Sequence, residues 1–411
     1  MKPVFHRSAR RYARLLIGLA TLCLVLVGLA NSTVNPWRVT PVPWEIKSLD
    51  NFRGTKDHLR TTKAGILRSG EWKVALVGSS RVANAFDPSL PSWGRSDVVN
   101  LGCNAAFLNE TTAIGRYFLE HEPAELLLLG IDPGDLTSKV DTRPLFDFDT
   151  SPFSPDSGLD NELRYVFGLS TFEASITTVQ DGLMMAPAEY GPKGMRRSPR
   201  AHPGTQHKFI ASTFTTPNEL ETADAAGPDR PLNEGKLGKL RDLLEECQAR
   251  DCRVVVFFHS NHALMHAETK HIGSGVIPFE KERRVLVKLI ADLSPRSGRP
   301  IELWDFCNYH ALNCEAVPSA IPEGAKAQET KMANWNDLGH FTPEVGSQML
   351  ALMLGWPLPH PEWSGIGRKL DPANLDAYLH EVGTGYQRYL TQEGAKDLAW
   401  KEGLKVVRSG P

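Results

Sequence analysis

The chain has 411 residues, of which 41% are hydrophobic and 23% charged, and its formal net charge is −2. This is the composition of an ordinary globular protein that can bury a large core. A nearly neutral chain with no long basic stripe beyond its N-terminus offers no electrostatic basis for binding nucleic acid. The sequence also shows no internal repeat, coiled coil or low-complexity tract.

The N-terminus combines a basic flank with an apolar run. Five Lys and Arg residues precede the run from Leu15 to Ala30, and no acidic residue occurs before Glu45. This order predicts a cytoplasmic N-terminus and a following segment that crosses the membrane. We interpret residues 1–36 as an uncleaved anchor, with a signal peptide cleaved near Gly28-Leu29-Ala30 as the alternative. The remainder is then extracytoplasmic: the periplasmic part of a single-pass inner-membrane protein, or a secreted protein if the signal is cut.

After a linker with a helix over 37–70, short apolar runs alternate with helical patterns. Such alternation predicts an α/β domain with a parallel sheet covered on both faces. We expect strands at 74–77, 97–102, 126–131, 252–258 and 301–306, and helices at 49–67, 110–121, 232–250 and 279–293, with a closing helix that ends near 354.

This domain is expected to span residues 71–358. Residues 138–232, rich in Asp, Pro, Ser and Gly, form an insertion with short helices at 163–169 and 172–183; long insertions over such a sheet are often lids or substrate surfaces. A tail over 359–411 carries helical patterns at 374–390 and 392–406.

Four of the six cysteines form two close pairs, Cys247/Cys252 and Cys307/Cys314. Disulfides are permitted outside the cytoplasm. A local bridge between Cys247 and Cys252 is one interpretation, and buried free thiols are the other.

The first candidate for chemistry follows the strand at 74–77. Gly78 permits a tight turn that delivers Ser79 and Ser80 at the carboxyl end of the strand, where ligands bind in open α/β sheets. A serine on such a turn has an exposed Oγ and a neighbouring backbone N–H for an oxyanion. Ser80 is therefore a candidate nucleophile.

A second candidate lies far along the chain. Asp337 and His340 are three residues apart and can face the same way. The carboxylate can then hold one imidazole nitrogen while the other takes a proton from Ser80. Thr342-Pro343 begins the next helix, with threonine at the cap and proline at the first position.

A histidine cluster raises a metal-site alternative. His262 and His266 are four residues apart, near His259 and His271, but no Glu accompanies them in the usual zinc-protease pattern. A thiolate zinc site over residues 307–314 is less expected where disulfides form. We expect no metal and no other cofactor.

Taken together, these segments resemble the SGNH/GDSL hydrolase superfamily. Gly78-Ser79-Ser80 resembles its first block, Asn100-Leu101-Gly102 its second, Gly130-Ile131-Asp132 its third and Asp337–His340 its last, in the same order and at strand ends across residues 71–356. The resemblance implies a flavodoxin-like three-layer fold with a parallel sheet.

The chain is more closely similar to membrane-anchored SGNH-like proteins of bacterial surface-polysaccharide assembly and O-acetylation. The segments that carry this similarity are Gly78–Arg81, Ser260–His262, Trp304–Phe306 and Asp337–Phe341.

The resemblance implies roles for the site residues. Ser80 is the nucleophile, His340 the general acid and base, and Asp337 its orienting partner. The oxyanion is held by the backbone N–H groups of Ser80 and Gly102 together with one side chain. The superfamily has an asparagine where this chain has Asp132, an acceptor when ionised, so Asn104 is the other candidate donor.

Two further residues are candidate substrate contacts. Arg81 binds a carboxylated sugar or an acyl carbonyl, or else caps a neighbouring carboxylate. His262 contacts substrate, or else is a structural histidine.

The resemblance predicts an extracytoplasmic serine esterase or O-acyltransferase, with acetyl as the expected group, that acts on a cell-surface or exported polysaccharide. Its partners are a glycan or acyl ester, the membrane and a membrane protein that hands over acyl groups. The alternative is a non-catalytic SGNH-like module that binds polysaccharide in an assembly complex.

Overall fold

The computed structural model describes residues 4–54, 56–139, 147–197, 206–215, 230–294, 299–318 and 331–408. Its contacts divide the chain into two compact units, one of Met1–Glu71 with Pro144–Pro192 and one of Trp72–Arg143 with Lys193–Pro411. These boundaries differ from the predicted ones. Much of the insertion expected over 138–232 packs with the N-terminal segment instead of with the sheet domain.

The second unit is built on a six-stranded sheet in the order β2-β1-β3-β4-β5-β8. Neighbouring strands are parallel except for β8, which pairs antiparallel with β5. The predicted α/β class with a mainly parallel sheet is confirmed. The strands are β1 (Val74–Val77), β2 (Val98–Asn100), β3 (Leu126–Ile131), β4 (Arg253–Phe258), β5 (Glu302–Asp305) and β8 (Arg368–Leu370).

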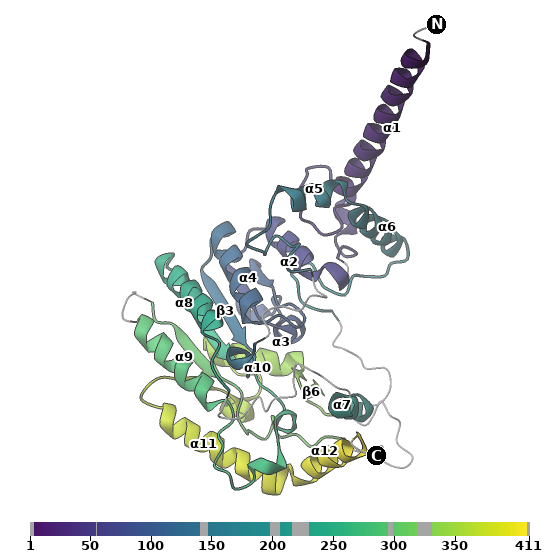
Figure 1. Ribbon diagram of the computed structural model, residues 1–411. Coiled ribbons are helices and arrows are strands. Elements are labelled where there is room, and N and C mark those ends of the chain that lie inside the picture. The colour runs from purple at the N-terminus through teal and green to yellow at the C-terminus, as the bar shows by residue number, and fades with distance from the viewer. Residues whose placement is uncertain are drawn as a thin grey trace. The chain divides into compact units, whose positions relative to one another are not determined.

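Helices cover both faces of this sheet, because the apolar strands alternate their side chains between them. Leu127 faces one layer and Leu76 and Leu128 the core of the other. The first layer, seen beside β3 in Figure 1, holds α4 (Leu108–His121), α8 (Glu234–Ala249) and α9 (Glu280–Leu293). The second holds α3 (Ser80–Ala85), α10 (Pro343–Leu354) and a hairpin of β6 (Trp335–Asp337) and β7 (His340–Phe341).

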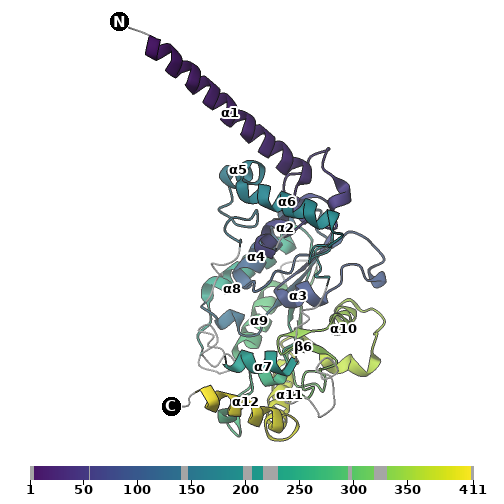
Figure 2. The same cartoon turned by 90° about the vertical axis from the view of Figure 1, so that its right-hand side faces the viewer.

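The predicted helical tail is present. It consists of α11 (Leu375–Arg388), a π-helical turn (Tyr389–Glu393) and α12 (Ala395–Arg408). The tail lies beside α7 (Gln206–Thr215), a helix from the insertion that the sequence did not predict (Figure 2). Short 3-10 helices occur at Lys47–Leu49, Lys56–His58, Pro91–Trp93, Asp135–Thr137, Ala263–Met265, Thr269–His271 and Pro361–Ile366.

The first unit contains α1 (Val4–Val34), α2 (Leu59–Arg68), α5 (Leu159–Phe167) and α6 (Leu169–Leu183). Its small core consists of Trp37, Val39, Tyr165 and Ala174. The helix expected at 49–67 begins ten residues later than predicted. Gly54 has φ +107°, a left-handed conformation that a helix does not contain.

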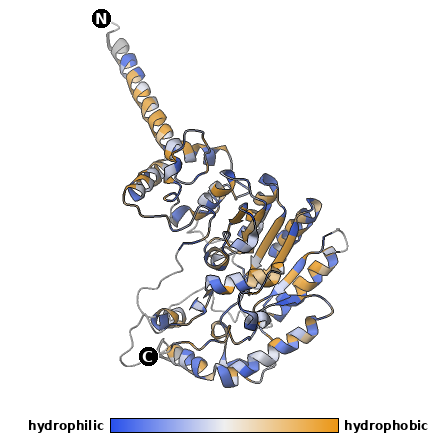
Figure 3. Cartoon of the chain, turned by 180° about the vertical axis from the view of Figure 1, so that it is seen from behind, coloured by the Kyte–Doolittle hydropathy of each residue, from blue (hydrophilic) through white to orange (hydrophobic). Residues whose placement is uncertain are grey.

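Among the described residues, one helix is long and apolar enough to cross a membrane, from Ala9 to Val34. Figure 3 shows apolar residues along most of its length.

All six cysteines are free thiols. Cys247, near the end of α8, and Cys252, just before β4, are hydrogen-bonded to each other. This hydrogen bond, together with burial, raises the pKa of Cys247 well above that of an ordinary thiol. In the structure Cys247 and Cys252 are therefore buried free thiols and do not form the local disulfide bridge.

Candidate active site

The structure brings Ser80, His340 and Asp337 into one chain of hydrogen bonds. Ser80 Oγ lies 2.7 Å from His340 Nε2, and His340 Nδ1 lies 2.8 Å from both carboxylate oxygens of Asp337. The Asp337 and His340 side chains are 8% and 15% exposed, which shields the pair while leaving the histidine accessible. This is the arrangement in which a carboxylate fixes the imidazole tautomer and the imidazole accepts a serine proton.

Ser80 owes its position to the turn between β1 and α3. Ser79 is the N-cap of α3 and its hydroxyl accepts the N–H of Arg81 at 3.4 Å. Ser80 is the first residue of the helix, so its own N–H has no intrahelical partner and is available at the site. A β-carbon at Gly78 would lie 2.5 Å from the Val82 side chain, so a larger residue there would have to displace Val82 from its place in α3.

Asp337 and His340 lie on either side of the turn that joins β6 to β7. The Gly339 N–H donates to Asp337 Oδ1 at 2.8 Å, which orients the carboxylate toward the histidine. Gln206, at the start of α7, donates to the Trp335 carbonyl at 2.6 Å and anchors β6 from outside the hairpin. No sequence pattern pointed to Gln206, because it lies in an irregular insertion 129 residues before Trp335.

The expectation that Gly102 supplies an oxyanion N–H is wrong. Its N–H donates to the buried Asn100 Oδ1 at 2.9 Å. Gly102 has a packing role instead, because a β-carbon there would lie 2.4 Å from the Ala83 nitrogen. Asn100 in turn donates to the carbonyls of Val82 and Phe86 at 2.8 and 2.7 Å and so fixes α3 against the end of β2.

Asn104 lies in the loop after β2, beside the nucleophile turn. The adjacent Cys103 N–H donates to the Gly78 carbonyl at 3.0 Å, which holds this loop against the end of β1. Asn104 is partly exposed. It therefore remains the side-chain candidate for an oxyanion donor, next to the Ser80 N–H.

Asp132 is also not the oxyanion donor that the superfamily pattern suggests. Its carboxylate accepts the Ser79 hydroxyl at 2.9 Å and pairs with Arg81 Nη1 at 2.7 Å. Burial alone would raise the pKa of Asp132, but the positive charge of Arg81 and the Ser79 hydrogen bond outweigh it and lower the pKa below its usual value. An ionised, paired carboxylate accepts hydrogen bonds and cannot stabilise an oxyanion.

Arg81 was expected either to contact substrate or to cap a neighbouring carboxylate, and in the structure it caps the carboxylate of Asp132. Its guanidinium also lies against the turn that carries the histidine, since a β-carbon on Gly339 would be 3.4 Å from Arg81 Nη2. Arg81 thus bridges Asp132 and the β6–β7 turn.

His259 completes this buried group from the end of β4. It is fully buried, with Nε2 3.8 Å from Asp132 Oδ1. Burial lowers the pKa of His259 to about 3, so the ring is neutral at physiological pH. Glycine at 130 makes room for the ring, because a β-carbon there would lie 2.2 Å from His259 Nε2.

His262 is structural, which corrects its prediction as a substrate contact. It is fully buried, with Nε2 2.6 Å from the Glu315 carbonyl, and its Nδ1 accepts the Leu264 N–H at 3.2 Å. Its backbone N–H donates to the Leu338 carbonyl, inside the β6–β7 turn, at 3.1 Å. Through this backbone hydrogen bond, His262 holds the turn that carries Asp337 and His340.

The other histidines of the cluster have separate partners. His266 Nε2 lies 3.0 Å from Asn261 Nδ2, and His271 Nδ1 lies 2.7 Å from the Tyr386 hydroxyl. Within the described ranges, no three His, Cys, Asp or Glu side chains are placed to hold a metal ion.

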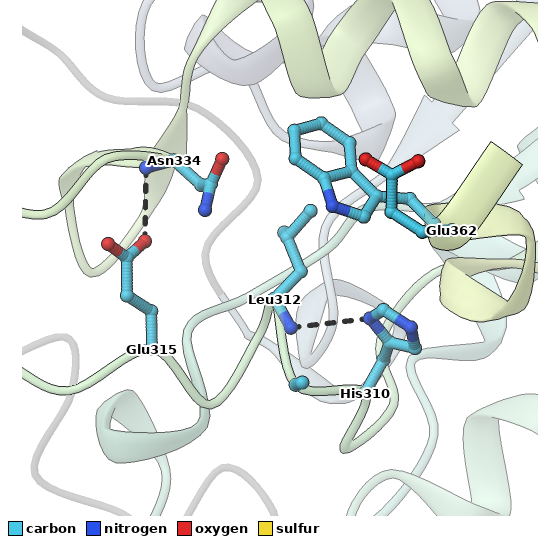
Figure 4. Close-up of a pocket in the computed structure, with 7 residues that line it drawn as sticks. His310, Leu312, Glu315, Asn334 and Glu362 are labelled. Atoms are coloured by element: carbon cyan, nitrogen blue, oxygen red, sulfur yellow. Dashed lines mark hydrogen bonds between the residues drawn. The ribbon is translucent and has the colours of Figure 1, made fainter. Parts of the chain in front are cut away.

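A pocket of about 390 Å³ opens at the other end of the β6–β7 hairpin. Figure 4 shows His310, Asn334 and Glu362 around the same space. Asn334 directly precedes β6, so the pocket lies about 10 Å along the strand from Asp337. Its lining residues are His310, Ala311, Leu312, Glu315, Asn334, Glu362 and Trp363.

The pocket offers an aromatic surface with hydrogen-bonding groups of both kinds. His310 Nδ1 accepts the Leu312 N–H at 3.2 Å, so its proton is on Nε2 (Figure 4). Burial lowers the pKa of His310, which keeps it a neutral donor. Glu315 accepts the Asn334 N–H at 3.0 Å.

Neither the models of known protein families nor the curated proteins compared with this sequence match it. The function therefore rests on the chemistry of the site.

Proposed function

We propose that the protein is an extracytoplasmic serine esterase or O-acyltransferase that works through an acyl-enzyme on Ser80. The observation that carries this proposal is the pair of short contacts from Ser80 to His340 and from His340 to Asp337. These three side chains come from two distant segments of the chain, and packing alone does not require them to line up as serine, histidine and aspartate with the serine partly exposed. Nucleophile, base and orienting carboxylate are what acyl transfer requires.

The reaction follows from these positions. Ser80 Oγ attacks the acyl carbonyl carbon while its proton passes to His340 Nε2, and Asp337 stabilises the imidazolium that forms. The bond to the leaving alkoxide then breaks, and His340 returns the proton to that alkoxide. An acceptor hydroxyl reverses both steps: it gives its proton to His340, takes the acyl group and frees Ser80. Water as acceptor makes an esterase, and a sugar hydroxyl makes a transferase.

We further propose membership of the SGNH hydrolase superfamily, with its flavodoxin-like three-layer fold. In support, each of the four resembling blocks follows or ends a strand: Gly78–Ser80 after β1, Asn100–Gly102 at β2, Gly130–Asp132 at β3 and Asp337–His340 at the β6–β7 turn. The first three positions are at the carboxyl ends of parallel strands, where this class of sheet binds ligands, and the fourth is on the separate β6–β7 hairpin.

The acceptor is proposed to be a glycan of the cell surface or of an exported polysaccharide. The pocket at His310, Asn334 and Glu362 supports a sugar ligand, because aromatic, amide and carboxylate groups together match a ring with several hydroxyls. An apolar N-terminal helix favours transfer at a membrane, where a partner would pass acyl groups across. Burial of Gly28 and Asn31 in the first unit supports retention of this helix.

Intact-protein mass spectrometry tests the acyl-enzyme. The full chain in mild detergent is incubated with p-nitrophenyl acetate, with Ser80→Ala as the control. We expect an acetyl adduct on the wild-type protein alone, and accumulation of this adduct in His340→Ala if slow acylation still occurs. Addition of oligosaccharides separates transfer from hydrolysis. An adduct of equal yield on Ser80→Ala would contradict the proposal.

One observation favours the non-catalytic alternative. Both oxyanion groups taken from the superfamily pattern, the Gly102 N–H and the Asp132 side chain, are engaged elsewhere. A protein without adduct or turnover that still binds an oligosaccharide at its pocket would be such a binding module. Glu362→Ala, distant from Ser80 along the chain, should then abolish binding, whereas Ser80→Ala should leave it unchanged.

A further inference from the structure

Helices α5 and α6 expose apolar side chains in a regular stripe. On α6, Leu169, Ile176, Val179 and Leu183 recur at helical spacing, and each is 37–81% exposed. The opposite face of α6 buries Thr171, Ser175 and Thr178. This orientation is the reverse of a water-facing helix, which buries its apolar face. We call the seven residues Leu159, Leu163, Phe167, Leu169, Ile176, Val179 and Leu183 the α5–α6 stripe.

The same two helices hold the last turns of α1. Asn31 Nδ2 donates to the carbonyls of Val166 and Gly168 at 2.9 and 3.2 Å, and the Ser175 hydroxyl donates to Asn31 Oδ1 at 3.1 Å. Gly28 allows close approach, because a β-carbon there would lie 2.8 Å from the Phe167 ring. Small residues and satisfied polar groups at a helix contact are typical of packing within a membrane.

The length of α1 sets the depth of this contact. The described part of the helix is exposed from Ala9 to Leu26, and from Gly28 one side of it is buried while Leu29 stays 52% exposed. From Leu15, the first residue after the last charge, to Val27 the helix rises only about 20 Å. The hydrocarbon layer is about 30 Å thick and needs roughly 20 residues. The span therefore has to include Gly28–Val34, the turns that α5 and α6 contact.

We propose that α5 and α6 are immersed in the leaflet in which α1 ends, with the α5–α6 stripe against lipid acyl chains. The stripe lies on the two helices that contact α1; outside the stripe these helices also expose the charged side chains of Asp160, Arg164 and Glu173. Trp44, 57% exposed in the same unit, is the kind of side chain that lies at the membrane interface. The two helices thus form an interfacial collar around the anchor and would attach the first unit to the membrane surface.

Photo-crosslinking of the full chain tests this. We would place p-benzoylphenylalanine at Leu169 or Leu183, which are 78% and 81% exposed, and reconstitute the protein in nanodiscs of phosphatidylethanolamine and phosphatidylglycerol. We expect a mass increase of one phospholipid at both positions. Lys239, exposed on α8 of the other unit, is the negative control and should give no lipid adduct. A cross-linked dimer, or no adduct at 169 and 183, would overturn the proposal.

A second position separates this proposal from the membrane span itself. Ile17, on the exposed part of α1, is the positive control, and the same group there should capture lipid. Adducts at 17 without adducts at 169 and 183 would show that α1 spans the bilayer while the collar stays in water. Adducts at 239 as strong as those at 169 would show unspecific capture and would also overturn the proposal. All the exchanged side chains are exposed, so the variants should fold.

Discussion

Arg81 and Asp132 form an ion pair of 2.7 Å that joins the start of α3 to the end of β3, one residue from the candidate nucleophile. Asp132 also accepts the hydroxyl of Ser79, which caps α3. Asp132, at the position expected to stabilise an oxyanion, therefore carries a negative charge that is balanced by Arg81. Its role is to fix the turn on which Ser80 is presented.

The ion pair should be measurable by a double-mutant cycle. Asp132→Asn should lower the free energy of unfolding by about 2–3 kcal/mol, less than a fully buried pair because the Asp132 side chain is 25% exposed. Arg81→Met should cost a similar amount. The double variant should lose less than the sum by at least about 1 kcal/mol. Denaturant unfolding in mild detergent gives all four values, and strict additivity would show that the pair contributes nothing.

Asp337→Asn should separate orientation from positioning. The amide can donate to His340 Nδ1, which forces the proton onto Nε2 and leaves no acceptor for the Ser80 proton. We expect acylation by p-nitrophenyl acetate to fall about 10⁴-fold with little loss of stability. Asp376→Asn, on the surface with its side chain 85% exposed, is the matched control and should acylate normally. A fall of less than about tenfold would remove Asp337 from the proposed mechanism.

The sequence predicted features that depend on local pattern. The apolar runs at 74–77 and 126–131 coincide with β1 and β3, because continuous burial between two helix layers leaves an unmistakable composition. Asp337 and His340 are three residues apart and meet across one turn. Their pairing could therefore be inferred without knowledge of the fold.

Long-range contacts could not be predicted in this way. Whether the Gly102 N–H is available at the site depends on Asn100, whose side-chain oxygen accepts that N–H. Whether Asp132 faces the oxyanion depends on Arg81, 51 positions earlier in the sequence and brought near by the β1–β3 pairing. The exposed stripe of α6 has the periodicity of an ordinary buried helix face, so its orientation follows only from the packing with α1.

Gly102→Ala should distinguish packing from catalysis at this position. The substitution keeps the N–H but puts a β-carbon 2.4 Å from the Ala83 nitrogen, so α3 has to move. We expect a loss of about 1–3 kcal/mol in stability and slower acylation of Ser80. Gly238→Ala in α8 is the control, because a β-carbon there meets nothing within 4 Å and should stabilise the helix by about 0.5–1 kcal/mol. Unchanged stability of Gly102→Ala would contradict the packing role.

Protonation of His262 should make the protein lose stability in mild acid. Burial lowers the pKa of His262 to about 4 in the folded protein, from 6.5 for the free group. Between pH 6.5 and 4 the unfolded chain binds a proton at His262 and the folded chain does not. The stability that depends on a neutral His262 is therefore complete above pH 6.5 and is lost as the pH falls from 6.5 toward 4. The loss is at most about 3 kcal/mol.

The structural reason is the occupancy of both ring nitrogens. A proton on Nδ1 would displace the Leu264 N–H, and the contact of the His262 backbone with Leu338 in the β6–β7 turn would weaken with it. His262→Asn should lower stability at about pH 7 yet show a smaller loss between about pH 7 and pH 5 than the wild type. His259, with a pKa of about 3, adds acid sensitivity of the same sign, whereas Glu282, whose pKa burial raises to about 7, acts in the opposite direction in both proteins. Equal losses in the two proteins, measured by urea unfolding at both pH values, would exclude His262 as a source of the pH dependence.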